Sequence, residues 1–454
     1  MSGGGRYLAG ARRSVFSPSL LRAPLRTFGA HPIVVLFMLH FFVRLHLCCS
    51  LLALSVFSCT PSPPPEEVSL PVGTWRVALA MQEQELPFLL ELEGNPVTGY
   101  EAYLRNGEEA ILIDSVVWSG DSLRLPMPVF DTELVGHVSD GQWRGEWRKN
   151  YADNYTLPFA ATHGDNYRFV ENATEPTANF GGRWAVQFAD DTLQAVGEFT
   201  QDGTRLTGSF LTSTGDYRYL AGNVEGDRMM LSAFDGEHAF LFHATLQEDS
   251  TLHGDFWSGR SYHTTWTAKR NEDAALADAD KLTYLKDGYD RLAFTFPDLS
   301  GQPVSLSDDK YRNKVVLVQL FGTWCPNCLD ETRFLTAWYD AHRDQDVAVV
   351  GLAYEQKDDF DYAAERVRKL VDKLDVGYDF LIAGTADKAA ASRTLPMLNR
   401  IMSFPTLIVL DQNHQVHRIH TGFSGPGTGE HYEAFVEDFE AMMKELLGEP
   451  KASN

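Results

Sequence analysis

The sequence predicts a multi-domain protein in which a duplicated antiparallel all-β region is followed by an α/β domain. Short motifs recur in the same order through the first part of the chain, and a different succession of strand-like and helix-like segments begins near residue 291. The length of 454 residues exceeds what one ordinary core fills. A hydrophobic content of 44% and an aromatic content of 12% supply enough apolar side chains for several cores.

The charge of the chain argues against a nucleic-acid partner. The formal net charge is -23 at pH 7, which gives a surface that repels polyanions. The first 58 residues differ from the rest, because they carry six Arg and no acidic residue. This asymmetry indicates that the front of the chain is a separate kind of segment.

The front segment has the pattern of an export signal. Its uninterrupted apolar part, Leu45 to Phe57, is shorter than the roughly 20 residues of a membrane span and matches the apolar region of a signal peptide. It ends in "SVFSC", and Cys59 is followed by the Pro-rich "TPSPPPEE". This pattern resembles a bacterial lipoprotein signal, which implies lipidation at Cys59 and a lipid anchor to the membrane. A cleaved signal without lipid and a retained anchor are the alternatives.

These observations predict the following boundaries along the chain. They are a signal peptide (1–58, with Met38 as an alternative start), an extended Pro-rich tether (59–71), β repeat 1 (72–160), β repeat 2 (161–270), a linker (271–290) and an α/β domain (291–449).

The repeat is visible in five pairs of motifs. "GTWRV" at Gly73 recurs as "GRWAV" at Gly182, and "VTG" at Val97 recurs as "LTG" at Leu206. "GDSLRL", "FDTE" and "GEW" follow in the first half, and "GDRMML", "FDGE" and "GDF" follow in the same order in the second half. Matches that keep their order predict a duplication.

Both halves have the texture of antiparallel β structure. Alternating runs such as "WRVALAM" and "AFLFHATL" are separated by Gly, Asp and Asn turns. Each half is expected to form a small barrel, or half of a joint barrel or sandwich. Trp75, Trp143, Trp147 and Trp184 are expected in the cores. No catalytic spacing occurs here, so a spacer or docking module is expected, with ligand binding inside a barrel as the alternative.

The last domain is predicted from the order of its elements. "FTFPDLSGQPVSLSD" predicts a hairpin, "KVVLVQLF" a buried central strand, and "GTWCPNC" a turn into a helix that begins at the first cysteine. "DVAVVGLAY" predicts a second strand, and the amphipathic helix "DYAAERVRKLVDKL" separates it from a third strand, "SFPTLIVLD". "VHRIHTGF" is expected to pair with that strand, and "HYEAFVEDFEAMMKELL" closes the domain as a helix. This order is that of the thioredoxin fold.

The cysteines narrow the chemistry. Of five, Cys48 and Cys49 lie in the predicted signal and Cys59 would carry lipid, so Cys325 and Cys328 alone remain in the folded part. Zinc needs about four ligands, and His414, His417 and His420 alternate faces on a predicted strand. The Cys-x-x-Cys pair is therefore expected to exchange electrons, without a metal or another cofactor.

The expected geometry suits disulfide exchange. A helix N-terminus favours negative charge, and the thiolate of Cys325 would be the attacking form. Pro326 falls in the first turn, where its missing N–H is not needed. Cys328 lies one turn on, where its sulfur can attack a mixed disulfide.

On "GTWCPNC", the downstream "FPT" and the order of elements, the domain resembles the TlpA/ResA-like thiol-disulfide oxidoreductases of the bacterial cell envelope. The resemblance implies a cis Phe404-Pro405 bond beside the cysteines, with Trp324, Pro326, Phe404 and Pro405 contacting the substrate. It implies a reductant of disulfides in envelope proteins, apocytochrome c among them. A membrane thiol transporter would supply the electrons, and the protein would face the periplasm or the cell surface.

Glu331 coincides with the glutamate of the family's Cys-x-x-Cys-x-x-Glu pattern, which implies a proton acceptor near the cysteines. A partly desolvated carboxyl group has a raised pKa, which suits that role. The alternative is an ordinary solvated carboxylate on the helix surface.

Two other functions compete with the reductase. A peroxiredoxin-like peroxidase shares the fold, but it needs a threonine where this sequence has Gly322, three residues before Cys325. A surface lipoprotein could instead bind a ligand through its β region, with the thioredoxin-like domain as an accessory. The pair "CPNC" does not by itself fix the direction of electron flow.

Overall fold

The computed structural model describes residues 70–448, which belong to one compact unit. The predicted signal peptide, Cys59 and nearly all of the tether lie outside the described residues. No helix between residues 70 and 448 combines the length and the apolarity needed to cross a bilayer.

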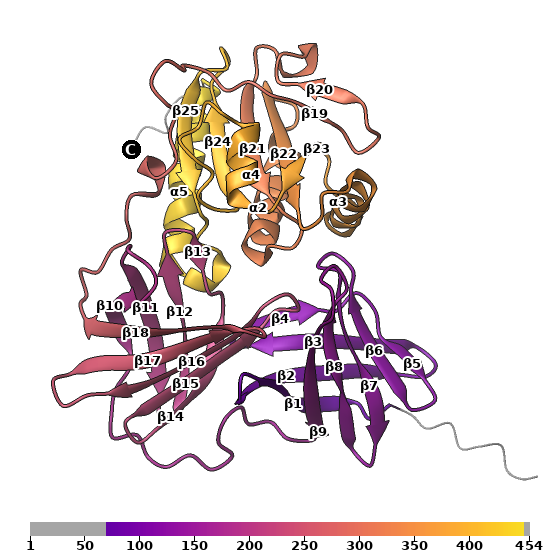
Figure 1. Cartoon of the computed structure of the whole chain (residues 1–454), viewed down its shortest axis with the longest axis vertical. Coiled ribbons are helices and arrows are strands. Elements are labelled where there is room, and N and C mark those ends of the chain that lie inside the picture. Colours follow the sequence, from indigo (N-terminus) through magenta and orange to yellow (C-terminus); the bar gives the residue numbers. More distant parts are fainter. Residues whose placement is uncertain (1–69, 449–454) are drawn as a thin grey trace, which may run out of the picture. The chain divides into compact units, whose positions relative to one another are not determined.

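The first β unit is a nine-stranded antiparallel sheet, drawn in indigo to purple in Figure 1. Its strands run in the spatial order β4-β3-β2-β1-β9-β8-β7-β6-β5, so the first strand pairs with the last. No pairing joins β4 to β5, and the sheet is open there. The strands are β1 (Gly73–Met81), β2 (Gln84–Asn95), β3 (Gly99–Asn106), β4 (Glu109–Leu112), β5 (Val117–Ser119), β6 (Ser122–Met127), β7 (Thr132–Ser139), β8 (Gln142–Lys149) and β9 (Tyr155–His163).

The second β unit is also a nine-stranded antiparallel sheet in which the first strand pairs with the last. Here β12 pairs with both β11 and β14, so the sheet closes into a barrel. Its strands are β10 (Gly182–Phe188), β11 (Ala195–Asp202), β12 (Arg205–Thr212), β13 (Gly215–Asp216), β14 (Leu220–Glu225), β15 (Arg228–Phe234), β16 (Ala239–Leu246), β17 (Thr251–Ser258) and β18 (Tyr262–Arg270).

Aromatic side chains fill both cores, as alternating inward positions on the strands require. Trp75, Trp143, Trp147 and Trp184 are all buried, which confirms the prediction that they pack in the cores. In the barrel of the second β unit the rings of Phe210 and Phe242 stack with their centroids 4.4 Å apart. An antiparallel β region followed by an α/β domain is therefore confirmed.

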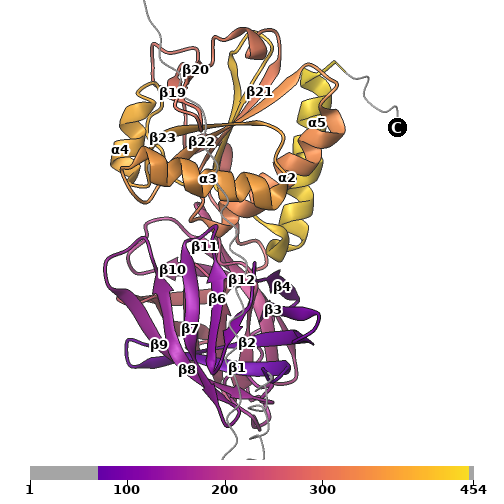
Figure 2. The same ribbon diagram turned by 90° about the vertical axis from the view of Figure 1, so that its right-hand side faces the viewer.

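The last domain has a five-stranded sheet of order β23-β22-β21-β24-β25, with β21 parallel to β22 and antiparallel to β24. Figure 2 shows its helices around the strands. The elements are the hairpin β19 (Thr295–Pro297) and β20 (Pro303–Ser305), the strands β21 (Val315–Phe321), β22 (Val347–Glu355), β23 (Asp379–Thr385), β24 (Thr406–Leu410) and β25 (Val416–Thr421), and the helices α2 (Pro326–His342), α3 (Phe360–Leu374), α4 (Lys388–Thr394) and α5 (Glu430–Leu446). Three short 3-10 helices are η1 (Ala279–Lys281), η2 (Asp309–Tyr311) and η3 (Pro426–Thr428).

The predicted elements of this domain are confirmed, and two elements were missed. β23 and α4 lie between α3 and β24, where the sequence pattern predicts a direct connection. β23 is an edge strand that pairs with β22 alone, and its run "DFLIAGT" is short and ends in small residues. Such a run carries a weak periodic signal, which explains the omission.

Both β units contact the last domain. From the first unit, the Pro128 carbonyl accepts a hydrogen bond of 2.8 Å from Arg366 of α3, and Asp131 forms an ion pair of 3.3 Å with the same side chain. From the second unit, Arg218 pairs with Asp330 of α2 and with Glu109 of β4. This buried guanidinium therefore connects the two β units and the cysteine helix.

Candidate active site

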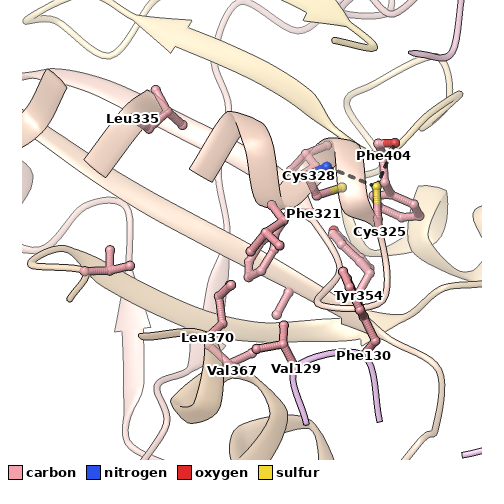
Figure 3. Close-up of a cluster of buried hydrophobic side chains, with 14 of the residues drawn as sticks. Val129, Phe130, Phe321, Cys325, Cys328, Leu335, Tyr354, Val367, Leu370 and Phe404 are labelled. Carbon is pink, nitrogen blue, oxygen red and sulfur yellow. Dashed lines mark hydrogen bonds between the residues drawn. The ribbon is translucent and has the colours of Figure 1, made fainter. Parts of the chain in front are cut away.

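The two cysteines lie at the start of α2, where the sequence analysis placed them. Cys325 is the N-cap residue, and its Sγ accepts a hydrogen bond of 3.2 Å from the backbone N–H of Cys328 (Figure 3). Both are free thiols. Cys325 is 7% exposed and Cys328 is 0% exposed, so only Cys325 is accessible to solvent.

The loop before β24 covers the first sulfur. The Phe404-Pro405 peptide bond is cis, as expected. The Cys325 thiol donates a hydrogen bond of 3.5 Å to the Phe404 carbonyl (Figure 3). The sulfur therefore lies between a helix N-terminus and a backbone acceptor.

Trp324 and Pro326 flank the nucleophile. The indole Nε1 of Trp324 donates to the Tyr354 carbonyl at 2.9 Å, which fixes the ring, and the ring meets Phe404 edge-on at 5.9 Å between centroids. Pro326 is buried at the first helical position, where it needs no hydrogen bond from its nitrogen. All six residues predicted at the exchange site thus lie together: Trp324, Cys325, Pro326, Cys328, Phe404 and Pro405.

Glu331 is fully buried, which rules out the solvated carboxylate of the alternative interpretation. Its Oε2 accepts a hydrogen bond of 2.8 Å from Gln319 of β21, and its Oε1 has no hydrogen-bond partner among residues 70–448. Burial raises the pKa of Glu331 to about 8, so the carboxyl group is protonated at neutral pH. Burial, and then the neighbouring Cys325, raise the pKa of the Cys328 thiol well above its usual range, and Glu331 adds to that shift.

Two polar groups that support this site were not predicted from the sequence. Gln319 holds Glu331, and its Oε1 accepts a hydrogen bond of 3.1 Å from Thr332 Oγ1. Glu355 at the end of β22 accepts hydrogen bonds of 2.8 Å from both the N–H and the hydroxyl of Thr323. Burial raises the pKa of Glu355 to about 7. The available signal was a polar residue inside or directly after a fully apolar strand, since such a residue needs a buried partner.

The barrel of the second β unit also contacts the site, which no local sequence pattern predicts. The Ser403 hydroxyl donates to the Thr214 carbonyl at 2.6 Å, and the Asn327 amide donates to the Asp216 carbonyl at 3.1 Å. Residues 212–217 therefore lie against both the cis-proline loop and the first turn of α2.

Comparisons with known proteins agree with this geometry. The Redoxin family model matches residues 286–435. Thioredoxin-like protein YneN of Bacillus subtilis is 28% identical over 138 residues, which are 30% of this chain and 73% of that protein. Thiol-disulfide oxidoreductase ResA of Halalkalibacterium halodurans is 22% identical over 157 residues, which are 35% of this chain and 77% of that protein.

Among solved structures, a thiol:disulfide interchange protein of the thioredoxin family from Chlorobium tepidum is 20% identical and covers 36% of this chain and 99% of its own, with a TM-score of 0.27. The family match and the curated relatives carry the assignment, together with the paired thiols at the start of α2. Residues 286–435 form a Redoxin-family domain, and this domain is a thioredoxin-like thiol-disulfide oxidoreductase.

Proposed function

We propose that the chain reduces disulfides of proteins in the bacterial cell envelope by dithiol exchange. One observation carries the proposal: a partly accessible sulfur, Cys325, lies at a helix N-terminus with a fully buried second thiol, Cys328, one turn behind it. This arrangement separates an attacking thiol from a resolving thiol.

The exchange runs in two steps. The Cys325 thiolate attacks one sulfur of the substrate disulfide, forms a mixed disulfide and expels the other sulfur as a thiolate. Cys328 then loses its proton and attacks Cys325 Sγ, which breaks the mixed disulfide and releases the second substrate thiol. The substrate gains two electrons and the enzyme ends with a Cys325–Cys328 disulfide. A dithiol of the membrane thiol transporter returns the two electrons.

Glu331 is the proposed proton acceptor for the second step. Its carboxyl group is buried with one oxygen free of hydrogen bonds, and it acts on the buried Cys328 electrostatically. Because its pKa is about 8, the ionised form that accepts a proton becomes abundant only as the pH approaches that value.

The activity is tested with the full chain, reduced beforehand and mixed with insulin. Precipitation of the released insulin B chain is the expected result, and Cys325→Ser should abolish it. Retention of the rate in Cys325→Ser would contradict the assignment of the nucleophile.

The location of the protein is part of the proposal. The basic front segment and the sequence "SVFSC" support export and a lipid anchor at Cys59. Mass spectrometry of the mature protein from membranes should find a diacylglyceryl-modified Cys59 at the N-terminus. An unmodified N-terminus at another residue would contradict the anchor.

We further propose that the β region arose by duplication. Both sheets have nine strands with the first strand paired to the last, and the recurring motifs fall on or directly beside corresponding strands. The indole N–H of Trp75 donates to the carbonyl of Pro71 and that of Trp184 to the carbonyl of Phe180, in each case four residues earlier. An alignment of homologues should keep these two tryptophans in register; unrelated profiles for the two halves would contradict the proposal.

A further inference from the structure

The second barrel is fixed against the active site by a short segment, residues 212–217. The backbone carbonyls of Thr214 and Asp216 accept hydrogen bonds from active-site side chains, as described above. In addition, the Asp216 Oδ2 accepts a hydrogen bond of 2.7 Å from the N–H of Gly425. A Cβ atom added at Gly422 would come within 3.2 Å of the backbone of residues 213–215, and Gly422 has a φ of +83°. The backbones therefore approach as closely as glycine allows, and the barrel is held in a defined place beside Cys325.

Between the barrel and the cysteine lies a cavity of about 310 Å³. Tyr217, His238 and Phe240 of the barrel line one side. The opposite side consists of Trp324, Cys325, Pro326, Asn327, Ser403 and Phe404. Small-ligand pockets begin at about 300 Å³, so this space is large enough for a disulfide and the groups bonded to it.

The barrel side of the cavity is built from packed aromatic rings. The rings of Tyr217 and Phe240 lie 5.0 Å apart, and His238 stacks on Phe240 at 4.8 Å. We call Tyr217, His238 and Phe240 the barrel wall. Because these rings support one another, the barrel wall keeps its shape when a substrate enters.

The charge of the cavity is uneven. Lys388, the first residue of α4, lines it, and its ammonium group has no ion-pair partner within residues 70–448. Asp216 also lines it, but its carboxylate already accepts hydrogen bonds from the N–H groups of Gly425 and Arg218. Desolvation lowers the pKa of Lys388, and Arg400 adds to this shift, while Cys325 and Asp191 oppose it.

We propose that the barrel wall and Lys388 together form a substrate-selecting site that favours disulfides with a carboxylate a few bonds from the sulfur. An acidic residue next to a cysteine carries this group, and so does a small disulfide dicarboxylic acid. The inference rests on the proposed disulfide reduction and specifies which disulfides react fastest. The barrel is then part of the enzyme's specificity and not a spacer.

The charge preference is tested with two small disulfides of matched length, dithiodipropionate and cystamine, which end in a carboxylate and an ammonium group. The full chain is reduced beforehand. For each disulfide, kcat/KM is divided by the rate constant of its reaction with free dithiothreitol, which corrects for the different intrinsic reactivity of the two disulfides. The wild type should favour dithiodipropionate. Lys388→Ala should lower this preference about tenfold, and Lys388→Glu should reverse it, because opposite charges steer opposite ligands.

Lys444→Glu on α5 is the control, because it makes the same charge change at an exposed residue outside the cavity. It should leave the preference unchanged. If Lys388→Glu and Lys444→Glu shift the preference equally, only net charge matters and the inference is overturned while the reductase activity stands. If the wild type reduces neither disulfide nor insulin, the proposed function fails, and the inference fails with it.

Two further arms separate the sources of the carboxylate and test the barrel wall. Disulfide-bonded peptides with Glu or Lys next to the cysteine should show the same dependence on Lys388 if polypeptides are substrates; a dependence confined to dithiodipropionate identifies small acids. Phe240→Ala widens the cavity and should raise kcat/KM for the bulkier peptides relative to dithiodipropionate. Tyr262→Ala, at a ring outside the cavity, should not, and equal effects of the two variants would overturn the role of the barrel wall.

Discussion

At the scale of single residues, the two thiols differ most in access. Cys325 is slightly exposed and Cys328 is fully buried, and burial raises the pKa of Cys328. Iodoacetamide should therefore alkylate Cys325 first in the reduced protein, as peptide mapping by mass spectrometry would reveal. Faster labelling of Cys328 would reverse the proposed roles.

The same difference predicts the behaviour of Cys328→Ser. Without the resolving thiol, the mixed disulfide between Cys325 and a substrate protein has no internal attacker and should accumulate. Non-reducing gel electrophoresis should show higher-mass adducts that dithiothreitol removes. The double variant with Cys325→Ser is the control and should form none of these adducts.

Glu331 makes the stability of the reduced protein depend on pH. Its pKa is about 8 in the folded state and 4.5 when unperturbed, so the folded state binds the proton more tightly than the unfolded chain. The stabilisation is complete below about pH 4.5 and is lost as the pH rises to about 8. Glu331→Gln cannot ionise and should show a flatter decline in the free energy of unfolding over this range.

Glu355 has a raised pKa of about 7, so its ionisation also lowers the free energy of unfolding as the pH rises. Glu331→Gln is therefore compared with the wild type at each pH in urea titrations. Glu433→Gln, at an exposed carboxylate of α5, is the control and should follow the wild-type curve. Identical slopes for wild type and Glu331→Gln would contradict the assigned protonation of Glu331.

At the scale of elements, the end of β22 positions the turn that leads into α2. The Glu355 carboxyl group accepts two hydrogen bonds from Thr323, the residue two positions before the nucleophile. Thr323→Val keeps the shape but removes the hydroxyl donor, and it should cost about 1–3 kcal/mol because a buried acceptor loses its partner. Thr385→Val, at a half-buried hydroxyl in β23, should cost less in the same denaturation experiment.

The elements also show what could be read from the sequence. Long apolar runs such as Val315–Phe321 and the glycine-bounded tryptophan motifs were predicted because their local pattern sets their burial. The exchange residues were found because Cys325, Cys328 and Pro405 belong to a specific motif. Gln319, Glu355 and Lys388 were missed, since their roles arise from contacts between segments far apart in the chain.

At the scale of the whole described chain, Arg218 holds three parts together. Its guanidinium is buried between Glu109 of the first sheet and Asp330 of α2. Asp330→Asn leaves this buried cation with Glu109 as its one ion-pair partner among residues 70–448 and should cost about 3–5 kcal/mol. Urea unfolding followed by tryptophan fluorescence would measure the loss.

Asp340→Asn is the matched control, because Asp340 lies on the same helix in an exposed ion pair with Arg343. Exposed pairs contribute about 0–1 kcal/mol, so this variant should unfold close to the wild type. Equal losses in the two variants would show that Arg218 does not depend on Asp330.

The segment 212–217 that lies against Cys325 has a consequence for biogenesis. The barrel precedes the cysteine helix in the chain, and domains generally fold in the order in which they are synthesised. The surface beside the nucleophile can therefore be complete before Cys325 leaves the ribosome. The newly synthesised Cys325 thiol then packs against an already folded barrel, which shields it from forming disulfides with other nascent chains.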